Sequence, residues 1–88
     1  MPAKYTIRQG LDVAREYASA AKLRALPAGT YICIGVQYET YVEWRAERKH
    51  PHKGDLNGRW TCTPATLRDL RSPRLLAFTI AIPEADNG

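Results

Sequence analysis

The sequence predicts a small α+β domain in which a mostly antiparallel sheet of about four strands packs against one long and one short helix. Three observations support this prediction. The 88 residues have an ordinary globular composition, 44% hydrophobic and 25% charged. The period of the apolar residues changes from 3.6 to 2 near Thr30. Turn and helix-ending residues then divide the chain into an α-β-β-β-α-β order, which forms a single domain over residues 1–88.

The long helix is expected between Thr6 and Leu26. Thr6 and Gln9 have the spacing of a capping box, and Pro27 ends the helix. Its apolar face would consist of Ile7, Leu11, Ala14, Ala18, Ala21 and Ala25. The alternative for the start of this segment is a short edge strand over residues 3–8.

A half-buried strand is expected over residues 31–38, where apolar and other residues alternate. A second alternating segment over residues 42–47 predicts a partner strand, with a turn near Glu39 and Thr40 and with Trp44 facing the core. The alternative is that Thr40 caps a short helix in this region. The alternation favours the strand, and the helix remains the alternative for residues 40–48.

The second half of the chain predicts a loop, a turn and a third strand. Pro51 and Gly54 interrupt regular structure in the loop over residues 49–54. Asn57-Gly58 is typical of a type I′ turn, because both central positions of that turn require positive φ. The third strand is expected over residues 59–62.

A short helix and a last strand complete the prediction. Thr63 and Pro64 have the residue types of an N-cap and a first helical position, and Ser72-Pro73 ends the helix. Residues 74–82 are apolar on both sides, which predicts an interior strand. Residues 83–88 are expected to form a frayed tail.

The cysteines and histidines predict neither a metal site nor a cofactor. Cys33 and Cys62 lie in predicted strands and are expected to be buried and reduced, with a bridge between them left open. His50 and His52 match no usual zinc spacing. No apolar run approaches the ~20 residues that a membrane span needs, and no signal segment is present, so we expect a cytoplasmic protein.

The positive charge suggests three candidate binding surfaces. The chain carries 13 Lys and Arg against 9 Asp and Glu, a net charge of +4. The first surface is a ridge of cations spaced by seven residues on the predicted long helix, namely Arg8, Arg15 and Lys22. Asp12 and Glu16 lie beside this ridge and provide the alternative of a solvated, locally paired face.

The other two cationic groups lie elsewhere in the chain. One surrounds the end of the short helix: Arg68, Arg71 and Arg74. The other is the basic segment around Arg48, Lys49 and Lys53, which Trp44 and Trp60 flank. Cations next to aromatic rings suit single-stranded nucleic acid, whereas Glu39, Glu43 and Glu47 would repel it.

Tyrosines predict a docking surface on the sheet. Tyr31 and Tyr41 are expected to project from the face opposite Ile32, in the company of Arg45. Tyr and Arg are enriched at the residues that dominate binding energy in protein interfaces. Cross-strand pairing of aromatic residues is the alternative, and we weigh the two equally.

No segment carries the residues of a known catalytic site, so we do not expect an enzyme. The expected function is a non-enzymatic protein-binding modulator or inhibitor of a larger macromolecular assembly, which could be a nucleoprotein. Small regulators of this kind are common products of phages and mobile elements. The alternative is a basic nucleic-acid-binding protein that contacts phosphates through the ridge and the basic segment. The identity of the partner, and whether the chain is a monomer or a homodimer, remain open.

Overall fold

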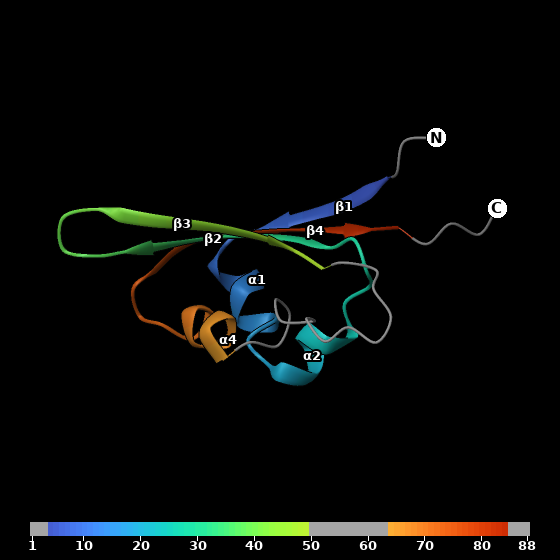
Figure 1. Cartoon of the computed structure of the whole chain (residues 1–88), viewed down its shortest axis with the longest axis horizontal. Coiled ribbons are helices and arrows are strands. Elements are labelled where there is room, and N and C mark those ends of the chain that lie inside the picture. The colour runs from blue at the N-terminus through green and yellow to red at the C-terminus, as the bar shows by residue number, and fades with distance from the viewer. Residues whose placement is uncertain (1–3, 50–63, 85–88) are drawn as a thin grey trace.

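The computed structural model describes residues 4–49 and 64–84 and confirms the α+β class. Within these residues, four strands form one antiparallel sheet in the order β1-β4-β2-β3. The three described helices all lie on one face of this sheet (Figure 1). The elements are β1 (Tyr5–Gln9), α1 (Leu11–Glu16), α2 (Ala20–Ala25), β2 (Tyr31–Gln37), β3 (Val42–Arg48), α4 (Pro64–Leu70) and β4 (Leu75–Pro83).

The prediction of one long N-terminal helix is wrong, and the alternative of a short edge strand is correct. Residues 5–9 form β1 and pair with β4. Gly10 then turns the chain from the strand into α1 with a φ of +117°, a conformation that side chains disfavour. Its N–H donates to the carbonyl of Phe78 at 2.9 Å, which extends the contact with β4. The pairing with β4 therefore outweighs the helical pattern of the segment.

The helical part of this segment is also divided in two. α1 ends at Glu16, and Ser19 begins α2 by accepting a hydrogen bond from the N–H of Lys22 at 3.4 Å. Ser19 is in the extended conformation typical of an N-cap residue. The end predicted near Pro27 is correct, because α2 stops at Ala25 and Leu26 is extended.

The hairpin prediction is correct, and residues 42–48 are a strand rather than a helix. The turn lies at the predicted position, and the N–H of Tyr38 donates to the carbonyl of Tyr41 at 2.8 Å across it. The alternating residues Ile32, Ile34 and Val36 are buried, in agreement with the pattern.

The prediction that Trp44 faces the core is wrong, because its side chain is 59% exposed. In the register of the hairpin, Trp44 is opposite Gly35, whereas Arg45 is opposite the buried Ile34. Among the described strands, β3 lies at the edge of the sheet, and its inward residues Arg45 and Glu47 bond to α4. The apolar residues of β3 consequently point away from the helices.

The short helix and the interior strand are confirmed as α4 and β4. The register between β2 and β4 shifts between Gly35 and Val36, which places Leu75, rather than Leu76, opposite Val36, and Leu76 is exposed. β4 extends to Pro83, beyond the predicted start of the tail. The N–H of Glu84 also donates to the carbonyl of Lys4 at 2.9 Å.

Several predictions fall outside the described residues. These are the turn at Asn57-Gly58, the strand over residues 59–62, the cap at Thr63, most of the loop and the end of the tail. His50, His52, Trp60 and Cys62 also lie outside the described residues. Cys33 is a free, half-buried cysteine.

The hydrophobic core lies between the sheet and the helices. It joins β2 and β4 to α1, α2, α4 and the residue after α2 through Val13, Ala14, Leu23, Leu26, Ile32, Ile34, Val36, Leu70, Phe78 and Ile80. Within the described helices, no segment is long and apolar enough to cross a membrane. We call the sheet face that packs on the helices the inner face and the opposite one the outer face.

Candidate interaction surface

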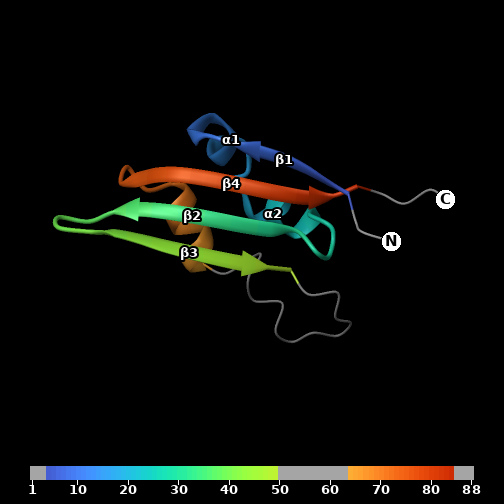
Figure 2. The same cartoon turned by 90° about the horizontal axis from the view of Figure 1, so that it is seen from above.

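The outer face of the sheet is not covered by any of the described elements (Figure 2). The pairing registers place on it the residues Tyr5, Ile7, Gln9, Tyr31, Cys33, Gly35, Gln37, Val42, Trp44, Ala46, Arg48, Ala77, Thr79, Ala81 and Pro83. Most of these side chains are apolar or aromatic, and Ile7 is 64% exposed. Because an exposed apolar face of this kind is uncommon in a monomer, it indicates a surface that binds something.

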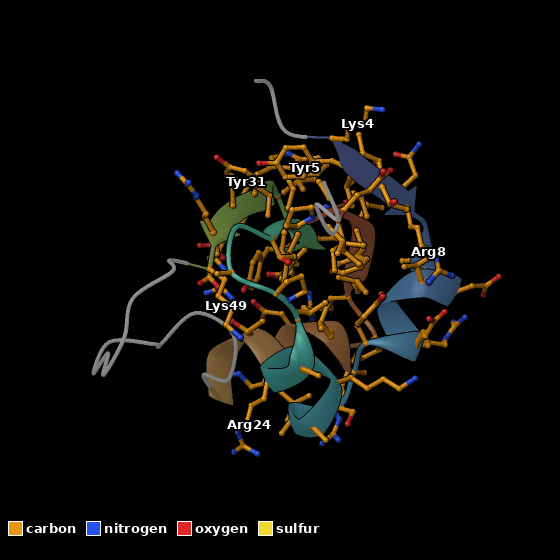
Figure 3. The ribbon with its side chains drawn as sticks, turned by 90° about the vertical axis from the view of Figure 1, so that its right-hand side faces the viewer. Lys4, Tyr5, Arg8, Arg24, Tyr31 and Lys49 are labelled. Carbon is orange, nitrogen blue, oxygen red and sulfur yellow. The ribbon has the colours of Figure 1, made fainter. Side chains whose placement is uncertain are left out.

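An aromatic and cationic cluster occupies one end of this face. The rings of Tyr5 and Tyr31 are tilted toward each other with centroids 6.1 Å apart, and the two side chains lie together in Figure 3. The guanidinium carbon of Arg48 lies 5.3 Å from the centroid of the Tyr31 ring, within the range of a cation–π interaction. β1, β2 and β3 therefore contribute one residue each to the cluster, which we call the Tyr-Arg cluster.

Trp44 provides a second aromatic contact on the outer face. Its ring lies over Gly35, which has no side chain to hold it away. The ring thus packs on the sheet at Gly35, while more than half of the Trp44 side chain stays accessible. A large aromatic residue held in this way is of the type that contributes most to binding energy at interfaces.

The outer face carries no carboxylate on any described strand. Glu43 and Glu47 lie on the inner side of β3, where the hydroxyl of Thr66 donates to Glu47 at 3.2 Å. Arg48 is the only Lys or Arg on the outer face of these described strands, because Arg8 and Arg45 point to the inner side. The face is therefore weakly positive and mostly apolar.

The ridge predicted from Arg8, Arg15 and Lys22 does not exist, because the three residues lie on β1, α1 and α2. Arg8 donates two hydrogen bonds to the carboxylate of Glu16, at 2.8 and 2.9 Å. This contact lowers the pKa of Glu16 and raises the pKa of Arg8. Arg15 instead pairs with Asp12 at 3.1 Å. Arg8 and Arg15 are thus both paired with nearby carboxylates, which is the alternative to a binding ridge.

Two further predicted binding residues have structural contacts. Arg45 forms an ion pair with Asp69, which ties β3 to α4 on the inner side of the sheet. The ammonium group of Lys49 donates to the carbonyls of Arg24 and Leu26, at 3.0 and 2.7 Å. These carbonyls belong to the end of α2, where a cation is also favoured by the helix dipole.

Tyr41 is exposed, but it does not join Tyr31. It lies in the β2–β3 turn, at the end of β2 opposite Tyr31, and stacks on Tyr38 with centroids 5.1 Å apart. Burial and the neighbouring carboxylate of Glu43 raise the pKa of Tyr38. The expectation of a shared tyrosine surface is therefore wrong, because the length of β2 separates the two rings.

Arg68 lies on α4 and Arg71 directly follows it, on the helix side of the sheet. Lys53 lies outside the described residues. Arg48 is the member of the three predicted cationic groups that lies on the outer face of the described strands, and the other described members do not join it there.

Sequence reasoning missed Tyr5, Ile7 and Trp44 as surface residues. The predicted helix contains Ile7 and begins just after Tyr5, and the predicted hairpin places Trp44 in the core. The alternation of Tyr5, Ile7 and Gln9 with Thr6 and Arg8 is a signal for a half-exposed strand, but it is only five residues long.

Among residues 4–49 and 64–84, no group of three or more His, Cys, Asp or Glu side chains could hold a metal ion. No family model matches the chain, and no curated protein or solved structure is significantly similar to it. The function is therefore inferred from the surface alone.

Proposed function

We propose that the chain is a non-enzymatic protein-binding module that docks a protein partner through the outer face of its sheet. The observation that carries this proposal concerns one face that none of the described elements covers. This face combines Tyr5, Ile7, Tyr31, Trp44 and Arg48 and has no carboxylate on the described strands. Tyr, Trp and Arg are the residues enriched at the energetic centres of protein interfaces, and charged residues are depleted there.

The centre of the face supports close approach by a partner. The outer positions of β4, the interior strand, carry the small residues Ala77, Thr79 and Ala81. Ala81 lies between the larger side chains of Ile7 on β1 and Tyr31 on β2, whereas Cys33 and Gly35 are the β2 residues beside Thr79 and Ala77. A partner could lay a helix or a strand over these small residues and contact the aromatic rings at the same time. A modulator or inhibitor of a larger assembly would act by occupying a surface of that assembly in this way.

The second candidate is single-stranded nucleic acid, which the Tyr-Arg cluster favours because bases stack on exposed rings. The distribution of cations argues against it. Nucleic-acid binding depends on neutralising several phosphates, and Arg48 is the only cation on the outer face of the described strands. A protein partner needs fewer charges on that face.

The test is an affinity capture from lysate of the source cells with three proteins: the wild type, the Tyr31→Ala/Trp44→Ala variant and the Tyr41→Ala variant. Tyr41→Ala is the control, because it removes an exposed aromatic ring that does not lie on the outer face. We expect a captured protein to be lost from the double variant and retained by the control. Truncating such an aromatic residue costs roughly 2 kcal/mol or more, which is about thirtyfold in Kd.

The competing candidate is tested with labelled single-stranded DNA and RNA, titrated in salt from about 50 to 200 mM. Submicromolar binding that falls steeply with salt and is lost in Tyr31→Ala would replace the protein-binding proposal. A partner that binds the double variant as strongly as the wild type would show that the outer face is not its docking surface.

A further inference from the structure

A groove on the helix side of the molecule has the chemistry to bind an acidic peptide. It lies between α1 and the end of α4 and encloses a volume of about 440 Å³. Leu11, Leu70 and Leu75 provide its apolar lining, and Arg15 and Arg71 provide its cations. The groove is on the opposite side of the sheet from the outer face, so it does not form part of the surface described above.

A second hollow adjoins it. This hollow encloses about 510 Å³ and is lined by Leu67, Arg68, Arg71, Ser72 and Pro73. Arg71, Ser72 and Pro73 line both hollows, so the two lie side by side at the end of α4. Three guanidinium groups therefore border two adjoining hollows that leucines partly line, and we call the two together the arginine groove.

The carboxylates of the surrounding helices leave most of this positive charge available. Asp69 lies on α4 between Arg68 and Leu70, but it is largely buried and pairs with Arg45 on the other side of the helix. Asp12 pairs with Arg15 at 3.1 Å, and the two side chains are 98% and 73% exposed. Because so exposed an ion pair contributes little to stability, a carboxylate of a partner can replace Asp12 at Arg15.

Arg71 is positioned to act as the centre of the groove. One of its terminal nitrogens donates to the carbonyl of Ala18 at 3.3 Å, so the side chain spans from α4 to the segment between α1 and α2. A guanidinium group has five N–H donors, and this hydrogen bond uses one of them. The remaining donors can bind a carboxylate in the paired, planar geometry that arginine favours.

We propose that the arginine groove binds an acidic segment of a protein partner, in which Asp or Glu side chains alternate with a large apolar side chain. The cations select the carboxylates, and Leu11, which is 39% exposed, would be covered by the apolar side chain. A nucleic acid fits this depression less well, because its phosphates would leave the leucines exposed to water. The proposal does not depend on the outer face, and each surface can be tested without the other.

The test begins with a selection from a library of random peptides on the immobilised full chain, without any assumption about the natural partner. We expect the enriched sequences to contain Asp or Glu next to Leu, Ile or Phe. One enriched peptide is then labelled, and its Kd is measured by fluorescence polarisation for the wild type and for Arg68→Gln/Arg71→Gln. We expect about tenfold weaker binding by the variant, because it removes two charge-assisted contacts.

Arg24→Gln is the matched control, because Arg24 is an exposed arginine on α2 that does not line the groove. Its Kd for the peptide should equal that of the wild type, and circular dichroism should show that all variants are folded. Enrichment of peptides without acidic residues would overturn the proposal, and so would equal binding by the double-arginine variant. Stronger binding of a single-stranded oligonucleotide to the same arginines would overturn it as well.

Discussion

The ring of Trp44 lies directly on Gly35, so closely that a Cβ atom at residue 35 would come within 2.6 Å of the ring. Gly35 does not have positive φ in the structure, so alanine would be compatible with its backbone. The atoms nearest to a side chain at this position are those of the Trp44 ring, so the cost of such a side chain comes from this contact. This contact links an interior strand to the most prominent aromatic residue of the outer face.

We expect Gly35→Ala to lower the free energy of unfolding by roughly 1–3 kcal/mol, as overpacking does at other close contacts. In a Trp44→Ala background the same substitution should cost much less, because the ring that it meets has gone. Chemical denaturation of the two single variants and the double variant measures the coupling. Additive effects would mean that the ring does not rest on Gly35 in solution.

The ion pair between Arg45 and Asp69 should contribute measurably to stability. Both side chains are less than one-third exposed, and the pair ties the edge strand β3 to α4. We expect Arg45→Met to lower the free energy of unfolding by roughly 1.5–3 kcal/mol, because it leaves the carboxylate of Asp69 without its partner. Arg15→Met is the control for an exposed pair and should change stability by less than about 0.5 kcal/mol. Equal effects of the two substitutions would contradict this prediction.

The pair of Arg8 and Glu16 should make stability depend on pH in the acid range. Arg8 lowers the pKa of Glu16 below its ordinary value of 4.5, so the unfolded chain binds the proton more readily than the folded one. The contribution of the pair is complete above pH 4.5 and is lost as the pH falls through the lowered pKa of the folded state. The free energies of unfolding of the wild type and of Glu16→Gln should therefore differ near neutral pH and converge once the pH has fallen below the lowered pKa of the folded state. A difference that stays constant with pH would exclude this linkage.

Lys49 should stabilise the end of α2. Its ammonium group donates to the carbonyls of Arg24 and Leu26, which have no partner further along the helix. We expect Lys49→Met to lower the free energy of unfolding by roughly 1–2 kcal/mol. Lys22→Met, at an exposed position of the same helix, is the comparison and should have little effect. If the two variants are equally stable, the contact does not persist in solution.

The strand pattern of residues 31–37 and 42–48 could be recognised from the sequence, because alternation with period 2 is typical of a half-buried strand and of few other structures. The same holds for the interior position of β4, which is apolar on both sides. The pattern did not show which side of β3 faces the helices. An edge strand can place either side inward if its inward residues find partners, and Arg45 and Glu47 find theirs on α4.

The candidate surfaces were less predictable than the fold. Residues 5–25 have a helical period, and the cationic ridge was expected because this segment was assigned to one helix. The assignment is wrong, because residues 5–9 pair with β4 as a strand. The arginine groove joins residues from α1 and from the end of α4, some 60 positions apart in the chain. A spacing rule within one element cannot find such a site.

The sequence by itself therefore determined the α+β class, the hairpin, the short helix and the interior strand, because each depends on a local period or on a local turn and cap signal. The tertiary structure alone decided that residues 5–9 are a strand, that Trp44 lies outside and that Tyr31, Arg48 and Tyr5 meet on one face. These outcomes depend on which strands pair with each other. Strand pairing joins segments that are far apart in the sequence, so the residues of one segment do not determine it.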